Sequence, residues 1–176
     1  LDLSYDMLLP QTMLVIVGGG LAGRCREVHE FLFGFFVCSL LALLVFAIWP
    51  AVGPFRAYGF EPSHLQQRYL EQFDAVRAGR LIELPWPDAV GLITFPSMHT
   101  SWAVLLAYAV RWNRWLFVPS ALLNLAVIAS TLTTGWHYFG DVAAGLAVAG
   151  TVIVGFRAWE RCARSRPIEG MSPAFH

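Results

Sequence analysis

An uncharged run of twenty residues, from Phe31 to Pro50, restricts the folds open to this chain more than any other feature. A helix needs roughly 20 apolar residues to cross the hydrocarbon core of a bilayer. The composition agrees, because 57% of the 176 residues are hydrophobic and 14% are charged. An average soluble domain is about 45–50% apolar and about 25% charged. We therefore expect an integral membrane protein.

The charge balance excludes two other classes of protein. The formal net charge is zero, whereas a disordered chain combines low hydrophobicity with high net charge and a nucleic-acid-binding protein carries a basic excess. All twelve basic residues are arginine, so any mechanism that needs a lysine is closed to this chain. The three cysteines form no C-x-x-C pair and predict no metal or disulfide framework.

Four more segments complete the expected fold, an all-α integral membrane helical bundle of about five transmembrane helices. In chain order the expected helices are Leu8–Gly23, Phe31–Pro50, Ser97–Val110, Trp115–Thr134 and Val142–Trp159. Pro10 and three glycines interrupt the first helix, and the third is short. Short segments with polar ends are common where a helix end lines a cavity.

A long polar segment separates the second and third helices. Its middle, Glu61 to Leu81, has apolar residues at helical spacing, which predicts one interfacial amphipathic helix: Leu65, Tyr69, Phe73 and Val76. We expect a single membrane domain over residues 1–166, with N-terminal parts missing, and a cytoplasmic tail over residues 167–176.

The arginines predict the orientation of the bundle. If the five helices alternate in direction, eight of the twelve arginines fall on one side: Arg24, Arg26, Arg111, Arg114, Arg157, Arg161, Arg164 and Arg166. The other four lie opposite, among seven acidic residues. The positive-inside rule places the first side in the cytoplasm. The third and fifth helices then begin at the extracytoplasmic face, and we expect that membrane to be a bacterial plasma membrane.

Two polar clusters lie at those two helix starts. FPSMHTS contains Ser97 and His99, and TTGWHYFGDV contains His137 and Asp141. Because His137 and Asp141 are four residues apart, a helix would place them on one face. There the carboxylate fixes the tautomer of the imidazole and leaves its other nitrogen basic, which is how a histidine nucleophile is built.

Ser97 is placed to cap the third helix. The backbone N–H groups of Ser97, Met98 and His99 would then point at a bound anion, and the helix dipole would add to the attraction. His99 would lie beside that anion, where it can protonate a leaving group. The pattern favours attack on a phosphoryl group whose oxygens are stabilised by fixed donors.

Both clusters resemble motifs of the type 2 phosphatidic acid phosphatase (PAP2) superfamily. Pro96-Ser97-Met98-His99 resembles its P-S-G-H element, and His137-Tyr138-Phe139-Gly140-Asp141 resembles its H-x-x-x-D element. The fuller stretches, FPSMHTS and ST-x5-HYFGD, look more like the inositolphosphotransferase branch, the inositol phosphorylceramide synthases and their bacterial relatives. The resemblance covers residues 92–158 and, more loosely, residues 5–53.

The resemblance implies a membrane phosphotransferase that needs no cofactor and no metal. It would move a phospho-headgroup, with phosphoinositol as the candidate, from a phospholipid to a lipid alcohol acceptor. His137 would be the nucleophile that forms a phosphohistidine, and Asp141 would orient it. His99 would act first as the acid on the leaving alcohol and then as the base on the acceptor. Ser97 would help to hold the phosphate.

The chain also departs from the superfamily pattern. The upstream lysine and R-P pair of the first motif are missing, and Ser130-Thr131 stands where the phosphatases have S-R. Met98 replaces the glycine of P-S-G-H. Arg56, after the second helix, is our candidate substitute for the missing cations. These losses favour the transferase branch over the phosphatases.

Three alternatives remain open at this point. With water as the acceptor, the same residues would make a lipid phosphate phosphatase. A protein that kept the fold without the activity would be a non-enzymatic membrane protein. His99, His137 and Asp141 could also form a three-ligand zinc site with an open position.

Overall fold

The computed structural model describes residues 6–59, 61–80 and 91–165, and every regular element in these ranges is a helix. In chain order the elements are α2 (Leu8–Met13), the π-helical turn η1 (Leu14–Gly18), α3 (Gly19–Leu21), α4 (Cys25–Ile48), α5 (Pro54–Ala57), α6 (His64–Arg77), α7 (Met98–Ala109), α8 (Arg114–Thr133) and α9 (Phe139–Arg164). The predicted all-α fold is therefore confirmed. The predicted cytoplasmic tail lies outside the described residues.

Three of the described helices are long and apolar enough to cross a membrane. They are α4, α8 and α9, with 24, 20 and 26 residues. Two shorter apolar helices stand where the other two spans were expected: α2, η1 and α3 form one helix over Leu8–Leu21, and α7 has 12 residues. Helix α4 begins earlier than predicted, at Cys25, and ends at Ile48, before the predicted end at Pro50. Helix α9 extends beyond its predicted bounds at both ends, from Phe139 to Arg164.

The first helix is continuous, although its sequence suggested two interruptions. Pro10 lies in the first turn, where a missing backbone N–H is tolerated. The chain leaves α3 through Gly23, whose φ of 70° is in the left-handed region. The N–H groups of Gly23 and Arg24 donate to the carbonyls of Gly20 and Gly19 at 3.1 and 2.8 Å, which is a Schellman ending. This turn sends the chain directly into α4.

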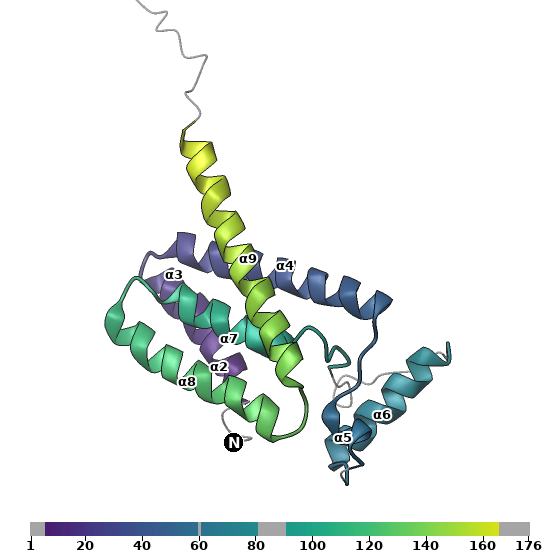
Figure 1. The fold of residues 1–176 in the computed structure, drawn as a ribbon. Helices are drawn as coiled ribbons and strands as arrows, with labels where there is room; N and C mark the ends of the chain where they lie inside the picture. The colour runs from purple at the N-terminus through teal and green to yellow at the C-terminus, as the bar shows by residue number, and fades with distance from the viewer. Residues whose placement is uncertain (1–5, 60, 81–90, 166–176) are drawn as a thin grey trace, which may run out of the picture.

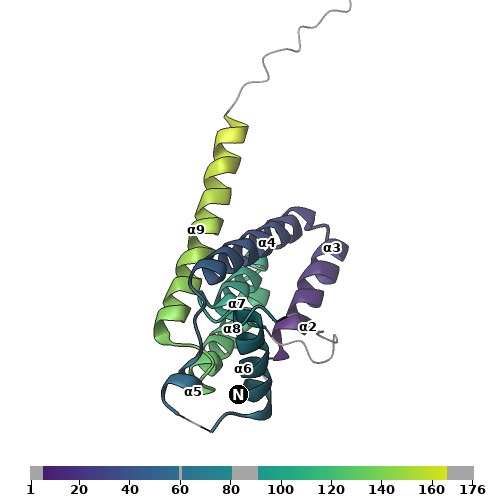
Figure 2. The same ribbon diagram turned by 90° about the vertical axis from the view of Figure 1, so that its right-hand side faces the viewer.

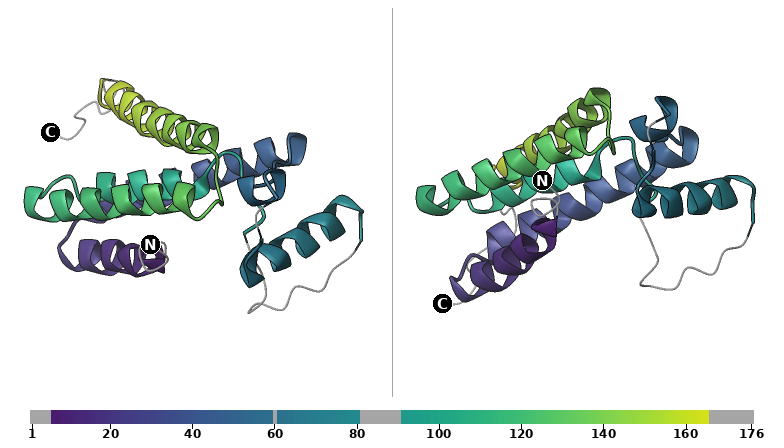
Figure 3. Two further views of the ribbon diagram at one scale, coloured as in Figure 1. Left: turned by 60° about the horizontal axis from the view of Figure 1, so that its bottom comes forward. Right: turned by 90° about the horizontal axis from the view of Figure 1, so that it is seen from below.

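Helix α7 lies at the centre of the bundle. It packs against α4, α8 and α9, and α2 also contacts it. In Figure 1, α9 crosses the bundle near α7, and Figure 3 shows α2 and α3 on one side of the α7–α8 pair, with α9 on the other side. The largest fully buried apolar side chains come from three of these helices: Phe31 and Cys38 of α4, Leu105 and Leu106 of α7, and Val127 of α8. The C-terminal part of α9 extends beyond the other helices (Figures 1 and 2).

Ion pairs join α4, α7 and α9 at one end of the bundle, which we call the arginine end. Glu30 of α4, whose side chain is 3% exposed, accepts from Arg26 Nε at 2.9 Å and from Arg111, just after α7. Arg26 also pairs with Glu160 of α9 at 2.5 Å. Helices α7 and α9 both end near these ion pairs. They therefore begin at the opposite end of the bundle.

Helices α5 and α6 cover that opposite end (Figures 1 and 3). Ser63 caps α6 by accepting from Gln66 N at 3.3 Å, and Gln66 caps back by accepting from Ser63 N at 2.9 Å. The predicted amphipathic helix is present, but only part of its predicted stripe is buried. Tyr69 and Phe73 pack with Phe55, whereas Leu65 and Val76 are 58% and 47% exposed. The buried part of the stripe is the part that joins this aromatic cluster.

Candidate functional site

Ser97 begins α7 as predicted. It is the N-cap residue, and its hydroxyl oxygen accepts from Thr100 N at 3.3 Å and from the Thr100 hydroxyl at 3.0 Å. The Ser97 side chain is fully buried. This cap places His99 in the first turn of α7, at the end of the bundle that α5 and α6 cover.

The backbone of Ser97 corrects one sequence expectation. We expected its N–H to point at an anion, but this N–H donates to the carbonyl of Asp141 at 3.0 Å. The bond joins the start of α7 to the first turn of α9. Ser97 N is therefore used to hold the two motifs together.

His137 and Asp141 lie side by side, but for a different reason from the one the spacing suggested. His137 precedes α9, whose N-cap is Tyr138, so the pair does not share a helix face. Instead, the Asp141 carboxylate reaches back and accepts from Tyr138 N at 2.8 Å through Oδ2. The same oxygen lies 3.5 Å from His137 Nδ1. The two side chains are therefore close, and the chain reversal at the helix start produces this. The predicted hydrogen bond itself is not formed, because His137 Nδ1 is buried without a hydrogen-bond partner.

The two imidazoles lie close together. The ring centroids of His99 and His137 are 5.9 Å apart, with the ring planes at 56°. His137 is 5% exposed, and its backbone N–H donates to the backbone carbonyl of Thr131 at 3.2 Å. Asp141 lies on the Nδ1 side of His137. The two predicted motifs thus bring His99, His137 and Asp141 together at one end of the bundle.

Gly145 lets α7 and α9 come this close. A Cβ at this position would lie 2.5 Å from the Ser97 carbonyl oxygen and 3.0 Å from Thr100 Cβ. The Gly145 carbonyl also accepts from the Ser101 hydroxyl at 2.9 Å. The helix crossing that positions both histidines therefore depends on a missing side chain.

Replacing Gly145 with alanine is expected to damage both stability and activity. The added methyl meets backbone, which cannot rotate away, so α7 and α9 must separate. Overpacking of this kind costs about 1–3 kcal/mol, and we expect activity to fall at least about tenfold. Gly150→Ala is the matched control on the same helix, because nothing lies within 4 Å of its Cβ position.

Thermal unfolding in detergent measures the comparison. Gly150→Ala should unfold at the same or a higher temperature, since alanine favours a helix over glycine by about 1 kcal/mol. Equal unfolding temperatures of Gly145→Ala and Gly150→Ala would contradict the role given to Gly145.

Comparison with known protein families identifies the family of this chain. A family model described as the PAP2 superfamily matches residues 1–155. The chain belongs to the PAP2 superfamily. Members of this superfamily are helical membrane proteins that act on lipids as phosphatases or phosphotransferases, so this PAP2 chain is assigned to that general class of enzyme. Comparisons with curated proteins and with solved structures gave no significant match.

The structure places the fifth predicted site residue of the PAP2 chain, Arg56, on α5. Its Nη1 donates to Asp74 of α6 at 2.9 Å, and both side chains are about half exposed. A phosphate bound by this guanidinium would have to share it with Asp74 or displace Asp74. Ser97, His99, His137 and Asp141 contact one another as described above, whereas the ion-pair partner of Arg56 is Asp74.

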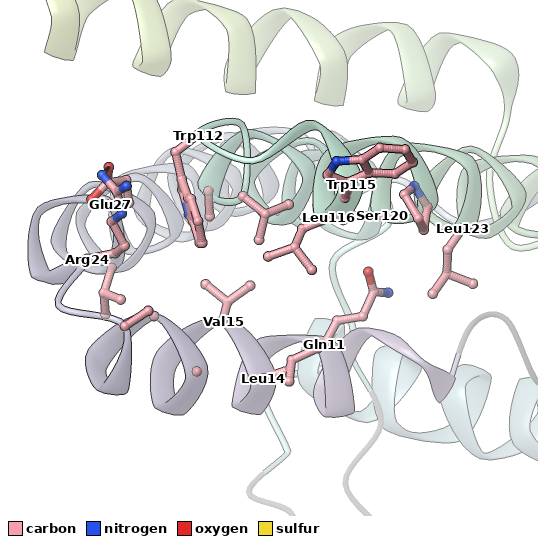
Figure 4. Close-up of a pocket in the computed structure, with 17 residues that line it drawn as sticks. Gln11, Leu14, Val15, Arg24, Glu27, Trp112, Trp115, Leu116, Ser120 and Leu123 are labelled. Atoms are coloured by element: carbon pink, nitrogen blue, oxygen red, sulfur yellow. Dashed lines mark ion pairs between the residues drawn. The ribbon is translucent and has the colours of Figure 1, made fainter.

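Two further observations concern a possible metal site and the position of a cavity. Within the described ranges, no group of three His, Cys, Asp or Glu side chains is arranged to hold a metal ion. A cavity of about 390 Å³ lies elsewhere, between α2–η1–α3 and α8. Figure 4 shows Gln11 and Leu14 on one wall and Trp115 and Leu123 on the other. None of the predicted site residues lines this cavity.

Three residues contact the two motifs in ways that the sequence did not predict. Thr131 holds the backbone of His137, Gly145 allows the helix crossing, and Tyr69 contacts the loops that carry both motifs. Thr131 and Gly145 lie within eight residues of a motif, but nothing in their residue type indicated these contacts. The sequence places Tyr69 in an apolar stripe, which predicts burial but not these contacts.

Proposed function

We propose that this PAP2 chain is a membrane phosphotransferase that moves a phospho-headgroup between lipids through a phosphohistidine at His137. The candidate headgroup is phosphoinositol, and the acceptor is a lipid alcohol. The observation that carries the proposal is the placement of the two imidazoles 5.9 Å apart, with the Asp141 carboxylate 3.5 Å from His137 Nδ1. The motif resemblance to the inositolphosphotransferase branch supports the choice of headgroup.

The first half-reaction forms the enzyme intermediate. The lone pair of His137 Nε2 attacks phosphorus, and the bond from phosphorus to the leaving oxygen of the donor lipid breaks. His99 gives its proton to that oxygen, which leaves as an alcohol. Positive charge develops on the His137 ring, and the adjacent Asp141 carboxylate stabilises it. The 3.5 Å contact is long for a hydrogen bond, and we expect it to shorten as the ring becomes charged.

The second half-reaction returns the enzyme to its starting state. The oxygen of the acceptor alcohol attacks phosphorus, the bond from phosphorus to Nε2 breaks, and His99 takes the acceptor proton. If water enters instead of a lipid alcohol, the product is free phosphate or a phosphorylated headgroup, and the same residues make a phosphatase. The acceptor thus decides the reaction class.

Binding of the phosphate would use the start of α7. The first N–H groups of a helix have no acceptor within the helix and attract anions. Ser97 would add its hydroxyl, and Arg56 would add a cation from α5. The arginine end is the cytoplasmic side by the positive-inside rule, which would place this site at the extracytoplasmic face of a bacterial plasma membrane.

Purified protein and vesicles containing phospholipid labelled in the headgroup phosphate test the proposal. Vesicles with added ceramide or diacylglycerol should yield a labelled lipid product, and vesicles without acceptor should yield much less labelled product. Release of water-soluble label in both samples would make the protein a phosphatase. No transfer and no release from any phospholipid would leave the non-enzymatic alternative.

His99→Ala is expected to lower the transfer rate about 10²-fold, because the leaving oxygen would depart without its proton. A donor with an acidic leaving group, such as a nitrophenyl phosphoester, needs no such proton. We therefore expect the variant to lose much less activity on that donor. An equal loss on both donors would remove His99 from the role of general acid.

A further inference from the structure

Tyr69 lies at the centre of the aromatic cluster that α6 places over the site. It is 1% exposed, and its ring contacts Phe55, Phe73 and Trp136 at centroid distances of 5.8, 5.7 and 5.8 Å. The apolar surroundings raise the pKa of the Tyr69 hydroxyl, because burial disfavours the phenolate. The hydroxyl is therefore neutral and can both donate and accept.

The Tyr69 hydroxyl joins three separate parts of the chain. It lies 2.9 Å from the Thr94 hydroxyl, 3.3 Å from the carbonyl of Ala51 and 3.4 Å from the carbonyl of Leu92. A tyrosine has one proton to donate. Because both carbonyls can only accept, that proton is shared between them, and Thr94 is left to donate to the Tyr69 oxygen. Every group in this network is then satisfied.

The network reaches both histidine motifs. Leu92 and Thr94 lie in the segment that leads into Ser97 and His99. On the other side, the Tyr69 ring meets Trp136 edge-on at 85°, and Trp136 immediately precedes His137. From the same helix, Gln66 Nε2 donates to the carbonyl of Thr134 at 3.2 Å, in the turn before Trp136. Helix α6 thus contacts the approach to each imidazole.

We infer that Tyr69 is a positioning residue, whose hydroxyl and ring fix the position of the His99 segment relative to the His137 segment. The inference rests on the proposed function, since the relative position of the two imidazoles matters most if both act on one phosphorus atom. Tyr69 acts through Thr94 and Trp136. Its loss is therefore expected to lower kcat with little change in KM.

Tyr69→Phe removes the hydroxyl and keeps the ring. We expect the rate of phosphoenzyme formation to fall about tenfold, because small displacements of reacting groups are costly. Thr94→Val should have the same effect, and the double variant should be no worse than either single one. Phe73→Leu is the matched control, because it disturbs the same aromatic cluster and leaves the hydroxyl network intact.

A second readout does not depend on activity. Diethyl pyrocarbonate modifies accessible imidazoles, and mass spectrometry gives the rate at each histidine. Tyr69→Phe should raise the rates at His99 and His137 by about tenfold and leave the rate at exposed His64 unchanged. Phe73→Leu should lower the unfolding temperature without this selective change.

The outcomes separate this inference from the proposed function. Unchanged modification of both histidines in Tyr69→Phe would overturn the inference, whatever the activity. Equal losses of kcat in Tyr69→Phe and Phe73→Leu would also overturn it, because the effect would then be general destabilisation. If the wild-type protein formed no phosphoenzyme, the proposed function would fail, and the modification rates alone would decide the positioning role.

Discussion

His137→Ala is expected to abolish lipid phosphotransfer, with a loss of about 10⁴-fold or more. In the proposed reaction His137 Nε2 makes the bond to phosphorus, and the variant offers no other group in that place. The His137 side chain is nearly completely buried beside Asp141, so its removal also leaves a carboxylate facing a small cavity. The measurement is the initial rate of labelled product formation in vesicles.

His64→Ala is the matched control for this loss. His64 is an exposed histidine at the start of α6, and we expect its replacement to leave the rate unchanged. The unfolding temperature of His137→Ala must be measured alongside, since an unfolded variant proves nothing about chemistry. A folded His137→Ala variant that retained a tenth of the rate would exclude His137 as the nucleophile.

Asp141→Asn is expected to have the second-largest effect, a loss of about 10³-fold. One oxygen, Oδ2, both accepts from Tyr138 N at 2.8 Å and faces His137 Nδ1 at 3.5 Å. The amide oxygen of asparagine can take over both contacts, so the helix cap survives and the ring keeps an acceptor beside Nδ1. What disappears is the negative charge that stabilises the charged ring. Where such a change also imposes the wrong tautomer, the loss is about 10⁴-fold.

Asp141→Ala separates the charge from the cap. It removes the acceptor for Tyr138 N as well, so we expect the unfolding temperature to fall, which Asp141→Asn should avoid. Circular dichroism melting curves compare the unfolding temperatures of the two variants. Transfer rates compare their activities. If Asp141→Asn kept full activity, the carboxylate charge would have no part in the reaction.

The sequence was most informative where a single local rule decides the structure. The uncharged run of α4 predicts a membrane helix by length alone, and Ser97 predicts a helix cap by the chemistry of its hydroxyl. The recurrence of two histidine motifs at helix starts also predicted that they meet at one end of the bundle. The first two features depend on residues near one another in the chain, and the third depends on the alternation of the helices across the membrane.

The sequence was less informative where the outcome depends on contacts between distant segments. Spacing predicted that His137 and Asp141 share a helix face, but the chain turns at Tyr138 and the cap of α9 brings them together. The Ser97 N–H was expected to bind an anion, and the approach of α9 gives it the Asp141 carbonyl instead. The role of Gly145 follows from where two helices cross, which no pattern in the sequence specifies.

Identification of the phosphorylated residue tests the central claim most directly. Wild-type protein would be mixed with phosphate-labelled donor lipid in the absence of acceptor, stopped in alkali and digested for mass spectrometry. The account predicts an acid-labile, alkali-stable phosphate on His137, lost when acceptor lipid is added and absent from His137→Ala. Label on another residue, or transfer to the acceptor without any labelled protein, would contradict it.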